Sequence, residues 1–197
     1  MERRLIVLVA VLILGANGVA LAQAPAPTGK VAEEALRIID DAGNKLVRLA
    51  EAIPAEKYSW RPGEGVRSVS EVFMHVAGGN FNIPRRIGAE VPAEVKLGPG
   101  FDKSVTEKAE VIAMLKKSFE HVKGAVMKVS DEDAGGKTAP WLGGRQATYR
   151  EIMFFLATHE HEHLGQAIAY TRSVGITPPW TEEAQQRQQQ QPPKKNP

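Results

Sequence analysis

Residues 149–174 read YREIMFFLATHEHEHLGQAIAYTRSV, and this stretch decides the fold of the chain. Apolar residues and two histidines recur in it at three- and four-residue steps, the spacing of one face of an α-helix. This stripe consists of Ile152, Leu156, His159, His163, Ala167 and Tyr170. Thr148 and Glu151 form a capping box at the start, and Gly175 followed by a Pro-Pro pair ends the segment. The pattern predicts a long amphipathic helix with histidines on its inner face.

The two histidines of the stripe suggest a metal site. His159 and His163 are four residues apart, so a helix places them one turn apart on the same side. Two neutral imidazoles at this spacing can bind one divalent cation, and burying both without a partner costs free energy. A hydrogen-bonded histidine pair in the core is the alternative. His161, Glu160 and Glu162 are predicted to lie on the flank or the solvent face, since each successive residue turns by about 100°.

Three earlier segments also have helical periodicity. The first covers about residues 29–52, with Val31, Ala35, Ile38, Ile39, Ala42, Leu46 and Leu49 inward. The second opens with a capping box of Ser68 and Glu71, is interrupted near Gly78-Gly79, and extends toward Ile87 with a kink or break at Pro84. The third covers about residues 105–129, with Ala109, Ile112, Leu115, Phe119, Val122 and Val126 inward. Residues 131–147 are predicted to be a loop. Four helices without strand alternation predict an all-α fold, an up-down four-helix bundle.

The two ends of the chain differ in composition from the rest. Residues 1–22 have a charged start, an apolar run and the small-residue signal Ala20-Leu21-Ala22, which predicts a signal peptide cleaved before Gln23. The alternative is an uncleaved membrane anchor, although the apolar run is short for a span. We therefore expect a secreted or periplasmic protein with no stable membrane insertion after cleavage. Residues 23–28 are predicted to be a linker, residues 29–181 the bundle, and residues 182–197 a disordered Gln- and Pro-rich tail.

Charge and cysteine content exclude some functions. The formal net charge is only +2 and no basic face stands out, so nothing favours nucleic acid as a partner. The chain has no cysteine, which excludes disulfides, thiolate metal ligands and a nucleophilic thiol.

A catalytic metal site usually has three protein ligands, so a third residue is needed. His121 lies among Lys117, Glu120 and Lys123 and is predicted to be solvated. His75 lies near the inner edge of the second helix, beside glycines that allow close approach. By its position, His75 is either the third ligand or a boundary histidine with satisfied hydrogen bonds.

Over about residues 30–180 the chain resembles the DinB/YfiT-like superfamily of metal-binding four-helix bundles. The matching elements are Trp60-Arg61-Pro62, Ser68 to Val72 with His75-Val76-Ala77, His159, His163-Leu164-Gly165-Gln166, Tyr170, Gly175 and Pro178-Pro179. The resemblance implies a three-histidine metal site, which here means His75, His159 and His163. A divalent ion is expected, with zinc or nickel suiting imidazole ligands. The Gly-rich end of the second helix and the export signal depart from the common pattern. Relatives are often dimeric, so a homodimer is an open expectation.

The resemblance implies a metal-dependent hydrolase or transferase acting on an unknown small-molecule substrate. One alternative is a non-catalytic metal-binding or structural bundle. Another is a zinc metalloprotease of the HExxH type, with Glu160 as general base and Glu182 or Glu183 as a distant third ligand. Gln166 or Glu162 is expected to hydrogen-bond a ligand histidine.

Residues outside the histidine pattern bear on a pocket. Phe154, Phe155 and Trp141 either line a pocket over the metal or anchor the core and the loop. Arg85-Arg86 is either an anion contact or a solvated helix end.

Overall fold

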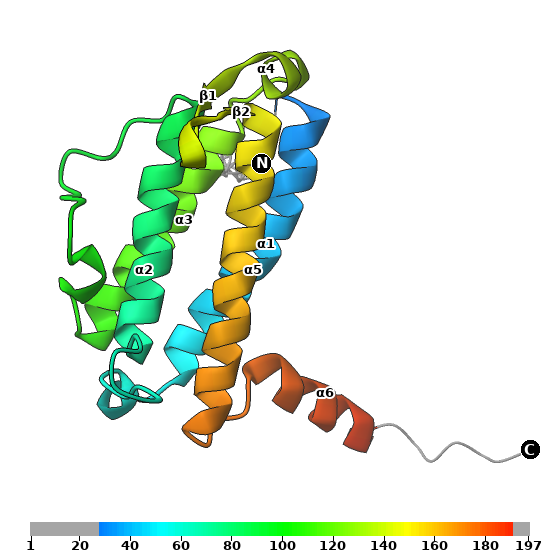
Figure 1. Ribbon diagram of the computed structural model, residues 1–197. Helices are drawn as coiled ribbons and strands as arrows, with labels where there is room; N and C mark the ends of the chain where they lie inside the picture. The colour runs from blue at the N-terminus through cyan, green and yellow to red at the C-terminus, as the bar shows by residue number, and fades with distance from the viewer. Residues whose placement is uncertain (1–27, 191–197) are drawn as a thin grey trace, which may run out of the picture.

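The computed structural model describes residues 28–190, and four long helices form its body (Figure 1). They are α1 Lys30–Ala52, α2 Val69–Asn82, α3 Lys108–Val126 and α5 Tyr149–Ser173. The shorter elements are the 3-10 helices η1 Ala55–Lys57, η2 Ile83–Ile87, η3 Phe101–Lys103 and η4 Leu142–Gly144, the helices α4 Asp131–Gly136 and α6 Pro179–Gln190, and the strands β1 Thr138–Pro140 and β2 Gln146–Thr148. Both α1 and α2 pack against α3 and against α5, so the four helices enclose a common core. The predicted all-α four-helix bundle is confirmed.

The helices do not strictly alternate in direction. After α2 the chain returns along the outside of the bundle through residues 83–107 before α3 begins (Figure 1). As a result, α2 and α3 run in the same direction, and the last turns of α2 lie beside the second half of α3. Asn80 bonds to Ser118, and Phe81 packs on His121 with ring centroids 5.4 Å apart. The antiparallel neighbour of α2 is α5, where the Tyr170 hydroxyl donates to the carbonyl of Arg67 just before α2.

Both capping boxes are present. The Ser68 hydroxyl accepts from the Glu71 N–H while the Glu71 carboxylate accepts from the Ser68 N–H, and Thr148 and Glu151 repeat the exchange at the start of α5. The predicted interruption at Gly78-Gly79 is wrong, because α2 continues through both glycines to Asn82. The tighter helix η2 follows, with a proline in its first turn where no N–H is needed.

Two large apolar clusters fill most of the core, one toward each end of the bundle, and a smaller one consists of Ala77, Phe81 and Val95. The large cluster near the β1–β2 hairpin includes Leu36, Ile39, Val126, Ile152 and Leu156, and the other large one includes Leu46, Leu49, Phe73, Leu115 and Leu164. On α3 and α5, Ser118 and Glu160 fall between the residues of the two large clusters, and both are 0% exposed. Two inward predictions were wrong: Ile38 is 43% exposed, and Ala109 is also exposed. Each lies at the edge of an apolar stripe where no neighbouring helix covers it.

The predicted loop before α5 contains structure. Strands β1 and β2 pair antiparallel, with Thr138 opposite Thr148, and close over one end of the bundle after the short helix α4. This hairpin brings the chain directly into the capping box of α5.

Disorder was predicted from residue 182 onward. This prediction is wrong for residues 182–190, because α6 extends to Gln190. Helix α6 is held to α1 by an ion pair between Glu183 and Arg48, and the Arg48 guanidinium lies 5.9 Å from the Trp180 ring centroid. The predicted signal peptide, nearly all of the predicted linker and the end of the tail lie outside the described residues. Within residues 28–190, no helix combines the length and hydropathy needed to cross a membrane.

Candidate metal centre

Three histidines meet between α2 and α5. His75 comes from α2, and His159 and His163 come from successive turns of α5. One ring nitrogen of each lies within 4.8 Å of the others. The His163 ring centroid is 4.6 Å from those of His75 and His159, which are 5.4 Å apart. The family resemblance implied this group, and the structure brings all three members together.

A glycine makes room for one of these rings. A Cβ atom on Gly79 would lie 2.6 Å from Cε1 of His159, well inside van der Waals contact. Gly78 receives the Phe101 ring in a similar way, with 3.0 Å from such a Cβ to Cδ1. The glycine pair therefore serves close packing of α2 against its neighbours and does not break the helix.

A chain of hydrogen bonds fixes the orientation of His163. The Tyr170 hydroxyl donates to the carbonyl oxygen of Arg67 at 3.1 Å, so its oxygen is left to accept from Gln166 Nε2 at 3.2 Å. This orients Gln166 Oε1 toward His163 Nδ1, 3.0 Å away, and makes Nδ1 the donor. The lone pair of Nε2 is then free for a metal ion. Gln166 is thus the outer partner that was expected, whereas Glu162 is exposed.

The surroundings keep two of the rings neutral. Burial is the main cause that lowers the pKa of His75 to about 4, followed by the positive charge of Arg67 and by His163. Burial also lowers the pKa of His159 to about 4, with His163 and His75 as further causes. Neutral imidazole is the form that binds a metal, so these two side chains are available as ligands at neutral pH.

The donor set suits a divalent ion. His159 Nδ1 is buried and has no hydrogen-bond partner among the described residues. Burying an unsatisfied ring nitrogen costs free energy, which a bond to an ion in the site would offset. Three imidazole nitrogens are a frequent ligand set of zinc, and one or more coordination positions remain for water or substrate.

The site opens to a cleft. A cavity of about 760 Å³ reaches His75 and His159 and extends over the glycine-rich part of α2. Its remaining lining residues are Arg67, Gly78, Gly79, Asn82, Ile83, Arg85, Leu97, Gly98, Gly100, Phe101, Asp102 and Phe155. A small molecule in this cavity can therefore reach the histidines from solvent.

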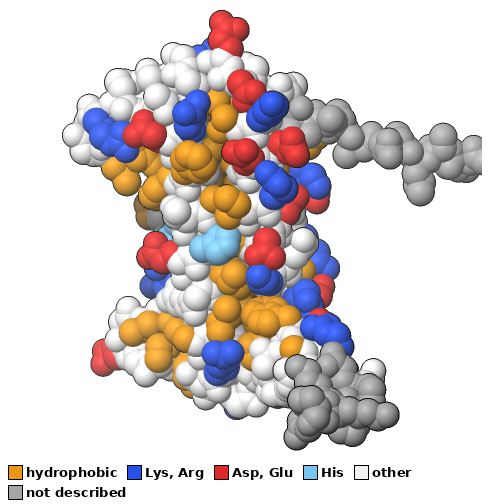
Figure 2. Space-filling model, turned by 90° about the vertical axis from the view of Figure 1, so that its right-hand side faces the viewer, with side chains coloured by type: hydrophobic (Ala, Val, Ile, Leu, Met, Phe, Trp, Pro, Cys, Tyr) orange, Lys and Arg blue, Asp and Glu red, His pale blue; other side chains and the backbone are white. Residues whose placement is uncertain are grey.

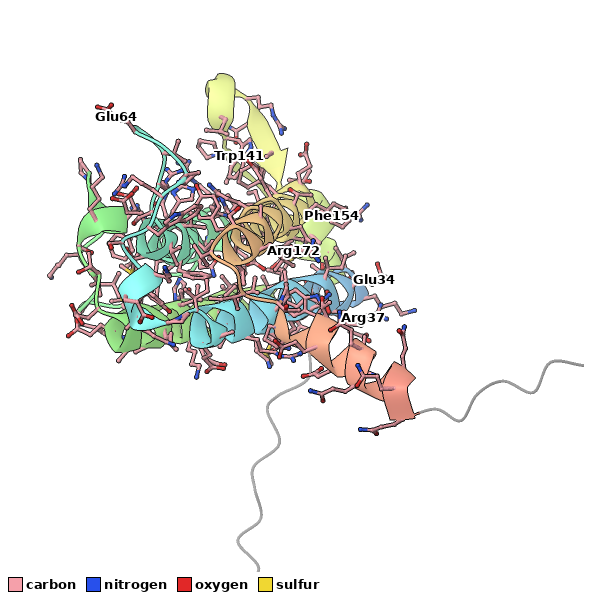
Figure 3. All side chains as sticks on the ribbon, turned by 90° about the horizontal axis from the view of Figure 1, so that it is seen from below. Glu34, Arg37, Glu64, Trp141, Phe154 and Arg172 are labelled. Atoms are coloured by element: carbon pink, nitrogen blue, oxygen red, sulfur yellow. The ribbon has the colours of Figure 1, made fainter. Side chains whose placement is uncertain are left out.

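Of the aromatic residues considered for a pocket, one lines the cleft. Phe155 stacks on His159 with ring centroids 6.0 Å apart, and Trp141 meets Phe155 edge-on at 5.0 Å. Phe154 is 45% exposed and lies on the outer side of α5 (Figure 3). Of the arginine pair, Arg85 lines the cleft, whereas Arg86 donates to the Pro140 carbonyl at the hairpin.

Two other histidines lie outside the site. His161 is exposed and its Nδ1 is 2.8 Å from the Ala157 carbonyl oxygen, as expected for the far side of α5. His121 was predicted to be solvated, which is wrong: it is partly buried against Phe81, and its Nε2 has no partner among the described residues. Its helix turns that side inward because α2 packs there.

The prediction that Glu160 lies on the flank or the solvent face of its helix is also wrong, because the residue is 0% exposed. Burial, and secondarily the charge of Asp40, raises its pKa to about 9, so the carboxyl is protonated at neutral pH. Helix α5 is covered by α1 as well as by α2, so the flank next to the histidine face is also enclosed. Glu160 therefore faces α1 and is not among the residues that meet at the histidines. Glu182 is exposed and Glu183 pairs with Arg48, an arrangement unlike that of a zincin protease.

Some residues around the site were not anticipated. Arg67 precedes the cap of α2, and Phe101 lies in η3 on the crossover from α2 to α3, so neither belongs to a helical stripe. The crossover contributes to the cleft through the path it takes around α2, which the sequence does not show. Its lining residues there are Leu97, Gly98, Gly100, Phe101 and Asp102.

Comparisons with known proteins agree with this fold. The sequence model described as the DinB superfamily matches residues 38–167. A DinB-like protein from Bacillus cereus is 19% identical, with a TM-score of 0.64 over 75% of this chain and 95% of its own. A DinB-like protein from Bacillus subtilis is 20% identical, with a TM-score of 0.59 over 73% and 94%. A mycothiol-dependent maleylpyruvate isomerase is 16% identical, with a TM-score of 0.53 over 68% and 59%. A search of curated proteins finds no significant match. The chain belongs to the DinB superfamily.

Proposed function

We propose that this protein binds one divalent metal ion through His75, His159 and His163 and uses it for hydrolysis or group transfer on a small molecule. The observation that carries the proposal is the convergence of three ring nitrogens within 4.8 Å at the end of an open cleft. Zinc and nickel both suit three imidazoles. Helices α2 and α5 supply the ligands from a packed core, which holds the rings in place before an ion binds.

The residues of the chain have separable roles in this activity. A bound divalent ion would supply Lewis acidity, lowering the pKa of a bound water or polarising a substrate oxygen. Gln166 and Tyr170 fix the tautomer of His163, and Gly79 admits the His159 ring. Phe155 and Phe101 form apolar walls of the cleft, which hold a substrate and limit water at the reacting centre.

A site that only stabilises the fold is the second candidate. The three histidines join α2 to α5, so an ion there would strengthen the bundle whatever its chemistry. The open cleft favours catalysis, because a purely structural zinc site is normally closed by a fourth protein ligand. The likeness to a mycothiol-dependent maleylpyruvate isomerase supports a catalytic role for this fold.

Metal analysis of the purified protein tests the proposal. We expect one zinc or nickel ion per chain. Replacing His75, His159 or His163 by alanine should reduce metal affinity by more than the roughly 10–100-fold that follows loss of a hydrogen-bond partner of a ligand. His161→Ala on the same helix is the matched control and should bind metal as the wild type does. A protein that takes up no divalent ion, or binds it equally well without His75, would overturn the proposal.

Spectroscopy of the cobalt-substituted protein separates catalysis from a structural role. Azide should change the visible spectrum if a coordination position is open to the cleft. A spectrum that azide leaves unchanged would favour the structural site.

We also infer export, which rests on the pattern of residues 1–22. Expression of the full chain in a bacterium with two membranes should yield a periplasmic protein that begins at Gln23 by mass spectrometry. A membrane-bound product of full mass would instead identify an uncleaved anchor.

A further inference from the structure

Two arginines line the cleft beside the histidines. They are Arg67 and Arg85, and Asp102 is the acidic residue among the described lining residues. Arg67 lies just before α2 and lines the same cavity as His75 and His159. Arg85 lies beyond the other end of α2, in η2.

The side chain and the backbone carbonyl of Arg67 each have a partner. Its Nε lies 3.3 Å from an oxygen of Asp102 in η3, and its carbonyl accepts from the Tyr170 hydroxyl. The latter bond belongs to the same chain that orients His163, so Arg67 and a ligand histidine share one support. Because Asp102 engages Nε, the two terminal nitrogens stay available within the described structure. These nitrogens form a planar fork that suits an oxyanion.

The rest of the cleft suits an organic molecule. Phe101, packed on Gly78, and Phe155, stacked on His159, provide apolar surface between the arginines. With a divalent ion at the histidines, the charges of the two arginines and the ion exceed that of Asp102 and favour an anionic ligand.

We infer that the cleft recognises small organic oxyanions, a carboxylate or phosphate group, which the terminal nitrogens of Arg67 bind while the reacting part of the molecule faces the histidines. This substrate class rests on the proposed metal function. The anion site itself consists of Arg67 and Asp102, so it can be measured with and without metal.

Calorimetry with defined probes tests the inference. The probes are 3-phenylpropionate, phenyl phosphate and the neutral 3-phenylpropanamide, titrated at one ionic strength into metal-free and zinc-loaded protein. The wild type should bind at least one of the anions more tightly than the amide in both forms. Arg67→Gln should weaken anion binding by about tenfold or more, the effect expected for a charge-assisted hydrogen bond. Its binding of the amide should stay unchanged.

The controls keep the outcomes apart. Arg172→Gln removes an exposed arginine in the last turn of α5, outside the cleft lining, and should bind anions normally (Figure 3). Arg67→Gln should retain full metal content. If the proposed metal function is wrong, the wild type will contain no metal. If the anion site is wrong, Arg67→Gln will bind the anions as tightly as the wild type does. Equal anion affinity in wild type and Arg67→Gln would overturn the inference. Loss in Arg85→Gln alone, or no anion binding to the wild type at millimolar concentration, would overturn it as well.

Discussion

Gly79 and His159 contact each other where α2 faces α5, and any Cβ atom at residue 79 would lie 2.6 Å from Cε1 of the ring. Gly79→Ala should therefore displace the His159 ring and weaken metal binding by about tenfold or more, the lower range for disturbing the support of a ligand. Gly165→Ala is the matched control, because it adds a methyl group to α5 where nothing lies within 4 Å. That control should keep normal metal affinity and gain a few tenths to about 1 kcal/mol of stability. Normal metal affinity in Gly79→Ala would show that the ring tolerates displacement.

Metal affinity should depend weakly on pH in mildly acidic solution. His75 and His159 have pKa values lowered to about 4, so protons compete with the ion at these two ligands only near that pH. Between pH 7.5 and 5.5 we expect the affinity to fall by no more than about tenfold, whereas three imidazoles with the usual pKa would lose about a thousandfold. Competition titrations with a chelator of known pH dependence measure this. A loss near a thousandfold would contradict the burial-induced pKa values.

Glu160 should make stability fall as the pH rises. Its pKa is raised to about 9 in the folded protein, so the unfolded chain releases the proton first as the pH increases. The stability is complete below about pH 4.5 and declines through about pH 9, with a loss of roughly 3 kcal/mol by pH 7. Glu160→Gln removes this titration and should flatten the profile of metal-free protein in urea denaturation. Glu34→Gln, on the exposed face of α1, should retain the slope (Figure 3). An equal slope in Glu160→Gln would contradict the prediction.

The hydrogen bond between His163 and Gln166 should contribute to metal affinity. Gln166→Leu removes the acceptor that fixes Nδ1 as donor, and we expect affinity to fall about 10–100-fold with the ion-to-protein ratio unchanged. Tyr170→Phe should have a smaller effect, since it acts one bond further away. Glu162→Gln, one residue before His163 but exposed, provides the comparison and should weaken binding much less, because no hydrogen bond to a ligand is lost. If Glu162→Gln weakens binding as much as Gln166→Leu does, the assigned partner is wrong.

Local sequence signals gave the helix starts and two ligands. The capping boxes at Ser68 and Thr148 depend on residues three apart, and the spacing of His159 and His163 places both on one face of any helix. His75 followed from the resemblance to relatives, because its distance from α5 depends on packing. The structure brings it within reach of both partners.

The errors arose where packing overrides local pattern. The stretch HEHEH (residues 159–163) places polar residues on every side of α5. Which of these sides is buried depends on packing against α1, which lies over a hundred residues earlier in the chain. Hence Glu160 was assigned to the wrong environment. The Gly78-Gly79 pair has low helix propensity. The helix nevertheless continues through it, because the rings of Phe101 and His159 pack directly against these glycines. The direction of α3 depends on how the crossover runs, and a Gly- and Pro-rich loop allows either path.

The face of the molecule shown in Figure 2 carries side chains of both charges. Basic and acidic side chains are interspersed over the described part of the face in Figure 2, with apolar groups between them. The positive charge that matters for ligands is inside the cleft, at Arg67 and Arg85.

The division of the three histidines between α2 and α5 has a consequence for assembly of the molecule during synthesis. Because His75 and the α5 pair belong to opposite halves of the chain, the coordination sphere is incomplete until the last long helix has docked. A nascent chain ending before α5 contains only one of the three site histidines, His75, and therefore lacks the site. Metal capture would thus report completion of the bundle, and a truncated translation product would remain metal-free.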